Sequence, residues 1–138
     1  MKVAIVSDTH GATDFNTIIS EHTPDINIHT GDSELKSTDS ILEAWHTVKG
    51  NMDFDSKTPK IKLIEWQGER ILIVHGHLQQ VEFGLLRLQY LAAEHQATIV
   101  CFGHTHRLGA EVIEGRLFVN AGSWSFPRGG NPPTYAIL

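Results

Sequence analysis

Short apolar runs separated by polar turns predict alternating strands and helices in the first half of the chain. The run from Lys2 to Ser7 is rich in Val and Ile and predicts a buried strand. The elements expected next are a helix over Asp14 to Glu21 with Thr13 as N-cap, a strand over Asp25 to Thr30, a short helix over Ser37 to Ala44 and a strand over Trp45 to Lys49. This order favours parallel strands joined by right-handed crossovers.

The second half adds antiparallel features. Two hairpins are expected at glycine turns, pairing Lys60 to Trp66 with Arg70 to Val74, and Gly109 to Glu114 with Arg116 to Val119. The remaining elements expected are a helix over Val81 to His95, a strand over Thr98 to Phe102 and a closing strand over Tyr135 to Leu138. We therefore expect an α/β fold, a single domain over 1–138 with two stacked mixed β-sheets and helices outside them.

Composition narrows the class of protein. A chain of 138 residues with 41% hydrophobic and 20% charged residues is typical of a globular domain with its own core. The net charge of −5 argues against stable nucleic-acid binding through a basic surface, although a nucleotide remains acceptable as a small substrate. One cysteine, no signal peptide and no apolar run of about 20 residues favour a cytoplasmic protein without a membrane partner.

Polar motifs follow five of the predicted strands. They are Asp8-Thr9-His10, Gly31-Asp32, Gly50-Asn51-Met52-Asp53, His75-Gly76-His77 and Gly103-His104-Thr105-His106. In α/β sheets, ligands bind in the crevice outside the carboxyl ends of the strands, so five such motifs are expected to converge on one place.

The residue types in these motifs indicate a metal site. Asp and Asn supply oxygen ligands, and neutral imidazole suits Mn, Fe, Co, Ni or Zn. In an extended backbone, residues two apart point the same way, which applies to Asp8 with His10 and to His104 with His106. The motifs offer seven candidate ligands, namely Asp8, His10, Asp32, Asn51, His75, His104 and His106. Seven ligands exceed the needs of one tetrahedral ion and suit two ions that share a carboxylate. Two ions arranged in this way clamp the attacking and leaving oxygens of an in-line phosphoryl displacement.

The ordered series of motifs resembles the calcineurin-like metallophosphoesterase superfamily. The compact version found here is similar to its small bacterial and archaeal phosphodiesterase branch. The late segment Asn120-Ala121-Gly122-Ser123, followed by Pro127-Arg128, also resembles the family, so the likeness spans the chain. The resemblance implies a four-layer sandwich of two mixed β-sheets flanked by helices, with the site at the sheet ends.

The resemblance also implies a ligand assignment and a reaction. One ion would be held by Asp8, His10, Asp32 and His106, and the other by Asp32, Asn51, His75 and His104, with Asp32 bridging both. The implied activity is hydrolysis of a small phosphate ester, a monoester or a diester, by a hydroxide that bridges two divalent ions. Mn²⁺ is the first choice of metal, with Zn²⁺, Fe²⁺, Ni²⁺ or Co²⁺ as alternatives, and a homodimer is compatible with the branch.

One position departs from the wider superfamily. Met52 stands where many members have a histidine that contacts the phosphate or protonates the leaving group. His77 is a candidate substitute, and a structural hydrogen bond is the alternative for it. Asp53 is expected to orient a ligand or stabilise its loop. Arg128 is expected on the solvated surface, with a phosphate contact or a subunit contact as alternatives.

Two other classes of function stay open. The eukaryotic retromer subunit Vps29 belongs to the same branch, so a non-enzymatic interaction module is the main alternative. In that subunit the pattern around the second motif residue is altered, whereas His10 is intact here, which favours catalysis. Some superfamily members cut DNA, but the acidic composition of this chain disfavours a nuclease.

Overall fold

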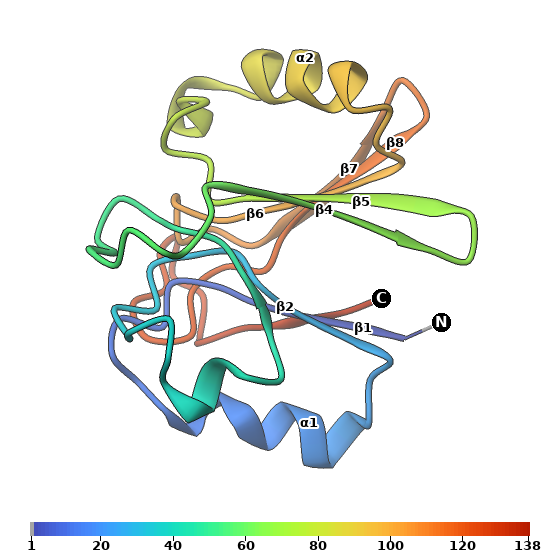
Figure 1. Cartoon of the computed structure of the whole chain (residues 1–138). Coiled ribbons are helices and arrows are strands. Elements are labelled where there is room, and N and C mark those ends of the chain that lie inside the picture. The colour runs from blue at the N-terminus through green and yellow to red at the C-terminus, as the bar shows by residue number, and fades with distance from the viewer. Residues whose placement is uncertain (1) are drawn as a thin grey trace.

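The buried β-branched runs form the central strands of two sheets in the computed structural model, which describes residues 2–138 (Figure 1). The first sheet has the strand order β3-β2-β1-β9. Its strands are β1 (Val3–Val6), β2 (Ile26–His29), β3 (His46–Thr47) and β9 (Ala136–Ile137). The first three are parallel, as the strand–helix–strand order predicted, and β9 runs antiparallel to β1.

The second sheet has the order β4-β5-β6-β8-β7. Its strands are β4 (Ile61–Trp66), β5 (Glu69–Val74), β6 (Ile99–Phe102), β7 (Gly109–Ile113) and β8 (Arg116–Asn120). Both predicted hairpins are present, and each forms one edge of the sheet. The central strands β5, β6 and β8 are parallel, so their carboxyl ends lie on one side.

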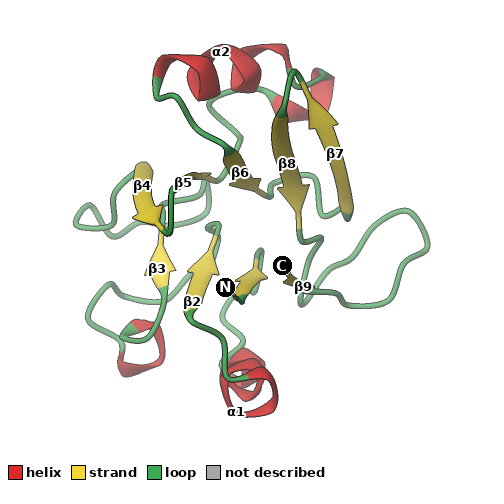
Figure 2. Ribbon diagram, turned by 90° about the vertical axis from the view of Figure 1, so that its right-hand side faces the viewer, coloured by secondary structure: helices red, strands yellow, loops and turns green. Residues whose placement is uncertain are grey.

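Three apolar clusters bind the layers together. Side chains from both sheets, including Ile5, Ile28, Ile73 and Cys101, fill the space between them. Helix α2 (Leu86–Glu94) packs Leu88 on the outer face of the second sheet. Residues of the helical segment around α1 (Thr17–His22) cover the outer face of the first sheet. The result is the expected four-layer order of helix, sheet, sheet and helix (Figures 1 and 2).

Several element boundaries predicted from the sequence are wrong. The first helix starts as a 3-10 turn, η1 (Asp14–Asn16), and Thr13 makes no side-chain capping hydrogen bond. The expected helix over Ser37 to Ala44 is only the 3-10 turn η2 (Ser40–Leu42), which starts after Asp39, whose side chain accepts a hydrogen bond from Ile41 N–H.

Two further segments are shorter than expected. The strand predicted over Trp45 to Lys49 is only two residues long, since β3 pairs with β2 at His46 and Thr47 alone. The helix predicted over Val81 to His95 is divided into η3 (Val81–Phe83) and α2 by Gly84, whose φ of 127° is incompatible with a right-handed helix. Among residues 2–138, no helix combines the length and apolar content required to cross a bilayer.

His29, at the end of β2, fixes the loops that leave the first sheet. Its Nδ1 accepts a hydrogen bond from Gly31 N–H at 3.1 Å, so its Nε2 carries the proton and donates to Thr9 Oγ1 at 2.9 Å. Complete burial disfavours the imidazolium and lowers the pKa of His29 to about 4. The neutral side chain thereby joins the loops after β1 and β2.

This pKa predicts a specific pH dependence of stability. In the unfolded chain His29 takes up a proton near its ordinary pKa of 6.5, whereas the folded chain resists protonation until about pH 4. The free energy of unfolding should therefore fall by ~3 kcal/mol as the pH drops through this window. Urea unfolding in EDTA between pH 7 and pH 4 measures the slope. His29→Gln should remove the part of the pH dependence that is due to His29, and the control His95→Gln, just after α2, should leave the pH dependence unchanged. Equal slopes in wild type and His29→Gln would contradict the assignment.

Candidate metal centre

Backbone hydrogen bonds extend the pairing of β1 and β2 into the loops that follow them. Asp8 N–H donates to Gly31 O at 3.0 Å and His10 N–H donates to Asp32 O at 2.9 Å. The second sheet is joined to this edge by His75, whose Nδ1 donates to Thr30 O at 3.0 Å. The motifs after β1, β2 and β5 therefore meet at one end of the sandwich, as the sequence predicted.

Two glycines permit the closest approach between these loops. A Cβ atom on Gly50 would lie 2.1 Å from Asp32 Oδ1, and one on Gly103 would lie 2.0 Å from Ser7 Oγ. Any side chain at either position would push the carboxylates out of place. The glycine in these two motifs is therefore a steric requirement of the site.

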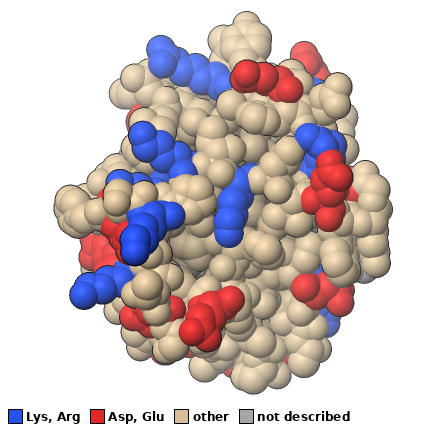
Figure 3. Space-filling model, viewed as in Figure 1, with Lys and Arg blue, Asp and Glu red and all other residues tan. Residues whose placement is uncertain are grey.

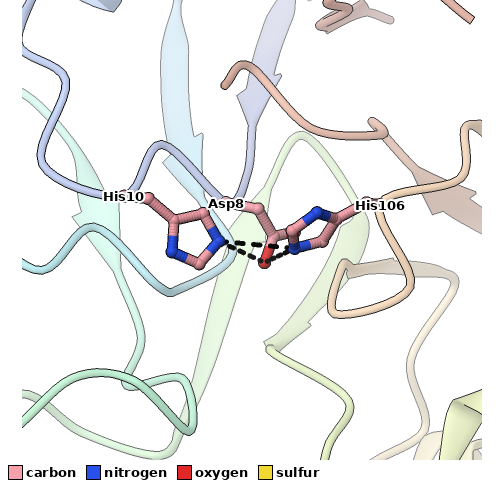
Figure 4. A group of neighbouring side chains, drawn as sticks. All are labelled: Asp8, His10 and His106. Carbon is pink, nitrogen blue, oxygen red and sulfur yellow. Dashed lines mark hydrogen bonds and ion pairs between the residues drawn. The ribbon is translucent and has the colours of Figure 1, made fainter. Parts of the chain in front are cut away.

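Three histidine side chains surround one carboxylate oxygen, Asp8 Oδ1. The Nε2 atoms of His106, His75 and His10 lie 3.3, 3.7 and 4.0 Å from it. Figure 4 shows Asp8 between His10 and His106, whose Nε2 atoms are 3.3 Å apart. Asp32 Oδ2 lies 3.2 Å from His75 Nε2 on the other side. Two potential metal-binding groups result, Asp8 with His10 and His106, and Asp8 with Asp32 and His75.

The opposite nitrogen of each of these histidines is held by an acceptor. Nδ1 of His75 donates to Thr30 O, Nδ1 of His106 donates to Phe126 O at 2.7 Å, and Nδ1 of His10 faces Glu34 Oε1 at 3.3 Å. Protein metal sites use this arrangement, because an acceptor on one ring nitrogen directs the lone pair of the other toward the ion.

The donor set fits a divalent cation. Asp8 Oδ1 is buried and accepts no hydrogen bond of proper geometry, while Asp8 Oδ2 is held by Ser7 Oγ and by His104 N–H. A buried carboxylate oxygen without a donor is unfavourable unless a positive charge compensates it. Asp8 belongs to both groups and Asp32 to one, whereas the family resemblance made Asp32 the bridge; which carboxylate bridges stays a prediction.

The carboxylates and imidazoles of the site shift one another's pKa values toward the charged forms. Burial alone raises the pKa of Asp8, but the neighbouring His106 and His75 outweigh it and hold that pKa below its usual 3.8. Asp32 has a lowered pKa for the same reasons, with His75 as its main partner. Burial acts against the imidazolium of His75, yet Asp32 and Asp8 raise its pKa, and Asp8 raises the pKa of His106. Both carboxylates are therefore ionised and attract cations.

The other two predicted ligands lie at the edge of this cluster. Asn51 Oδ1 is 3.1 Å from His75 Nε2, so it lies beside the second group. The ring centroid of His104 lies 5.2 Å from that of His75, but its Nε2 forms an ion pair with Glu82, and it belongs to neither group.

His77 is half-buried beside the cluster and is not part of the cavity lining described below. Its ring centroid is 5.3 Å from that of His75, and its buried Nδ1 has no hydrogen-bond partner among residues 2–138. Burial and the positive charge of His75 and His104 lower the pKa of His77, which disfavours the protonated form that a general acid requires. The structure brings it near the ligands without exposing it to the cavity described next.

A cavity of about 540 Å³ is lined by five of the predicted ligands, whereas the buried Asp8 and His75 are not part of its lining. Besides predicted ligands, its lining includes Met52, Glu82, Arg107 and Arg128. Arg128 is exposed, as expected, but it borders the cavity. Sequence reasoning missed Glu34, Glu82 and Arg107. Glu34 is two residues from Asp32 and Arg107 is next to His106, which is a usable signal, whereas nothing in the sequence connects Glu82 with His104.

Comparison with known proteins identifies the class to which this arrangement belongs. The family model for the calcineurin-like phosphoesterase superfamily domain matches residues 1–138. The probable metallophosphoesterase YsnB of Bacillus subtilis is 40% identical over 141 residues, covering 100% of this chain and 83% of that protein. The phosphodiesterase YfcE of Escherichia coli K12 is 32% identical over 129 residues, covering 85% and 66%.

Solved structures of similar proteins share the fold of this chain. The conserved uncharacterized protein of Streptococcus pneumoniae TIGR4, a predicted phosphoesterase, superposes with a TM-score of 0.94 at 34% identity, covering 99% of this chain and 80% of that one. Vps29 of Entamoeba histolytica superposes with a TM-score of 0.79 at 25% identity, covering 100% and 85%. The chain belongs to the calcineurin-like phosphoesterase superfamily, and membership implies that it binds divalent metal.

Asp53 holds together the loops that carry the predicted ligands, in agreement with the loop-stabilising role that the sequence analysis considered for it. Its buried carboxylate accepts hydrogen bonds from Asp32 N–H, Glu34 N–H and Gly50 N–H at 2.8, 2.7 and 2.8 Å. The loops after β2 and β3 are thus tied to a single side chain.

We expect Asp53→Asn to destabilise the fold even without metal. The amide offers one acceptor oxygen and turns an NH₂ group toward backbone donors, so the free energy of unfolding should fall by ~2–4 kcal/mol. Urea unfolding in EDTA measures the change, with exposed Asp25→Asn as the matched control. If Asp53→Asn unfolds at the same urea concentration as wild type, Asp53 does not hold these loops.

Proposed function

We propose that the chain is a phosphoesterase that hydrolyses a small phosphate ester with two divalent metal ions held at this site. The observation that carries the proposal is the convergence of three histidine Nε2 atoms on Asp8 Oδ1, each ring fixed from behind by an acceptor. Such a preorganised set of ligands has little purpose without a cation. The name phosphodiesterase, given to the relative YfcE, supports the same class of reaction.

We assign the ligands in two overlapping sets. Asp8, His10 and His106 would hold one ion and Asp8, Asp32 and His75 the other, with Asn51 beside the second set. His104 would complete that set if its ring left Glu82. Bound divalent ions at such a site supply Lewis-acid activation of water and charge neutralisation at the phosphoryl oxygens.

The protein's own groups then orient the ester. The Asn51 amide is exposed at the cavity and is placed to donate a hydrogen bond to a phosphoryl oxygen. Met52 also lines the cavity and offers no proton donor, and His77 has no place in the lining. We therefore expect efficient hydrolysis only of esters whose leaving group needs little protonation, such as aryl esters.

Activity should depend on metal and on both ligand sets. EDTA should abolish hydrolysis of 4-nitrophenyl phosphate esters, and Mn²⁺ should restore it, with Zn²⁺, Fe²⁺, Ni²⁺ and Co²⁺ as comparisons. His75→Ala or Asp32→Asn should lower kcat/KM at least ~100-fold, because each removes an ion ligand from the reaction centre. Asp25→Asn is the control. A folded, metal-loaded wild type that is inert on monoesters and diesters alike would overturn the proposal.

Metal stoichiometry tests the two-ion arrangement separately from turnover. Dialysed wild type should retain two Mn²⁺ per chain by elemental analysis, and His10→Ala should retain one. If Asp8 is shared, Asp8→Ala should lose both ions and Asp32→Ala should keep one. The reverse result for these two variants would identify Asp32 as the bridge, as the family resemblance implies. One ion per wild-type chain at saturation would exclude the two-ion site.

The main alternative is an interaction module. The likeness to Vps29 supports it, since a fold of this kind is shared by proteins with different roles. The intact His10 and the two complete ligand groups favour the enzyme. Metal-dependent turnover that is lost in His75→Ala separates the two functions, because a docking surface alone has no reason to hydrolyse an ester.

A further inference from the structure

The cavity beside the predicted ligands is larger and more unevenly charged than a single phosphoryl group requires. Its volume of about 540 Å³ lies within the range of small-molecule sites. Glu82 provides negative charge near His104, whereas Arg107 and Arg128 provide positive charge near His106. The lining therefore carries charges of both signs beside the predicted ligands.

The two arginines are held together beside His106. Arg107 follows His106 in the chain, and the backbone N–H of Arg128 donates to His106 O at 3.0 Å. The guanidinium of Arg107 lies against Gly129, where an added Cβ would be 3.0 Å from Arg107 Nη1. Asn131 Nδ2 donates to Arg128 O at 3.0 Å and closes the turn. Two guanidinium groups thus border the same part of the cavity.

Neither guanidinium is neutralised by the protein. Within the described residues, no carboxylate lies within 4.0 Å of Arg107 or Arg128, although Arg70 on β5 is paired with Glu65. The chain has 16 acidic and 11 basic residues, so acidic partners are in excess. On the face shown in Figure 3, basic and acidic side chains are interspersed. Two unpaired arginines at the rim of the candidate site form a local positive pair.

We infer that the substrate carries a second anionic group, a phosphoryl or carboxylate group, next to the scissile phosphate and bound by Arg107 and Arg128. The inference rests on the proposed function. Guanidinium groups match the planar oxygen pairs of carboxylate and phosphate and bind them through two parallel hydrogen bonds. Glu82 also lines the cavity and disfavours an anion placed against it, so the arginines are the favourable contact for a second negative group. The ligand-set residues serve the scissile phosphate, which leaves the arginines for this group.

A matched pair of ligands isolates the second charge. Full-length protein loaded with Mn²⁺ is titrated calorimetrically with 4-carboxybenzylphosphonate and with 4-carbamoylbenzylphosphonate, which have no P–O–C bond to hydrolyse. Hydrolysis is followed in parallel with two 4-nitrophenyl phosphodiesters whose second arm is 4-carboxyphenyl or 4-carbamoylphenyl. Each pair differs only in one negative charge, so the ratio within a pair reports on that charge alone.

Wild type should bind the carboxylate phosphonate ~10-fold more tightly than the amide, and kcat/KM should favour the carboxylate diester by a similar factor. The double variant Arg107→Gln/Arg128→Gln should bring both ratios to about 1, and Arg128→Glu should bring the binding ratio below 1. Exposed Arg87→Gln on α2 is the matched control and should keep the wild-type ratios.

Two results would overturn the inference. One is a wild-type binding ratio near 1. The other is a double variant that loses affinity equally for both phosphonates, which would place the arginines on the scissile phosphate itself. Failure of the proposed function has a different signature, because wild type would then hydrolyse neither diester whatever its preference among the phosphonates.

Discussion

The buried Asp8 carboxylate is the constraint on which the rest of the site depends. Its Oδ2 is satisfied by Ser7 and by the backbone of His104, but its Oδ1 lies near three imidazole nitrogens and has no hydrogen-bond partner among residues 2–138. An ionised oxygen in that position is costly unless positive charge lies next to it. The protein supplies part of this charge through His75 and His106, whose pKa values are raised. A divalent ion would supply more and would accept the lone pairs that the Nδ1 contacts direct inward.

Holding these groups together requires an unusual backbone. Five of the seven predicted ligands have positive φ, which costs about 1–2 kcal/mol for each non-glycine residue. The five are Asp8, His10, Asp32, His104 and His106. Residues outside the cavity lining offset this strain through hydrogen bonds to the loops. His29 joins the first two loops, Asp53 gathers three backbone N–H groups, and Ser123 Oγ donates to Asp8 O. The two sheets and their helices thus act as a rigid support for strained loops.

The sequence predicts the layers and the location of the site better than its details. Apolar runs locate the strands because burial determines them, and polar residues at the ends of parallel strands must meet. The helix expected over Ser37 to Ala44 forms only one 3-10 turn, which begins after the side-chain cap at Asp39, a local hydrogen bond that apolar spacing does not reveal. The pairing of His104 with Glu82 also lies beyond the sequence, since the two residues are separated along the chain and meet only through packing of η3 against the strand ends. Glu34, by contrast, follows Asp32 closely enough to have been considered.

Within one fold, function is decided by which side chains remain at the strand ends. Intact ligand groups alone specify that an anion can be bound and activated, but they do not contact the rest of the substrate and cannot distinguish one ester from another. Selectivity must come from the residues around them. Met52 lines the cavity without offering a proton donor, and Glu82 adds a negative charge to the lining beside His104. Arg107 and Arg128 add positive charge beside His106, and among residues 2–138 no carboxylate lies within 4.0 Å of either. Because these four residues line the same cavity as the predicted ligands, we expect them to select the substrate, while the predicted ligands serve the reaction itself.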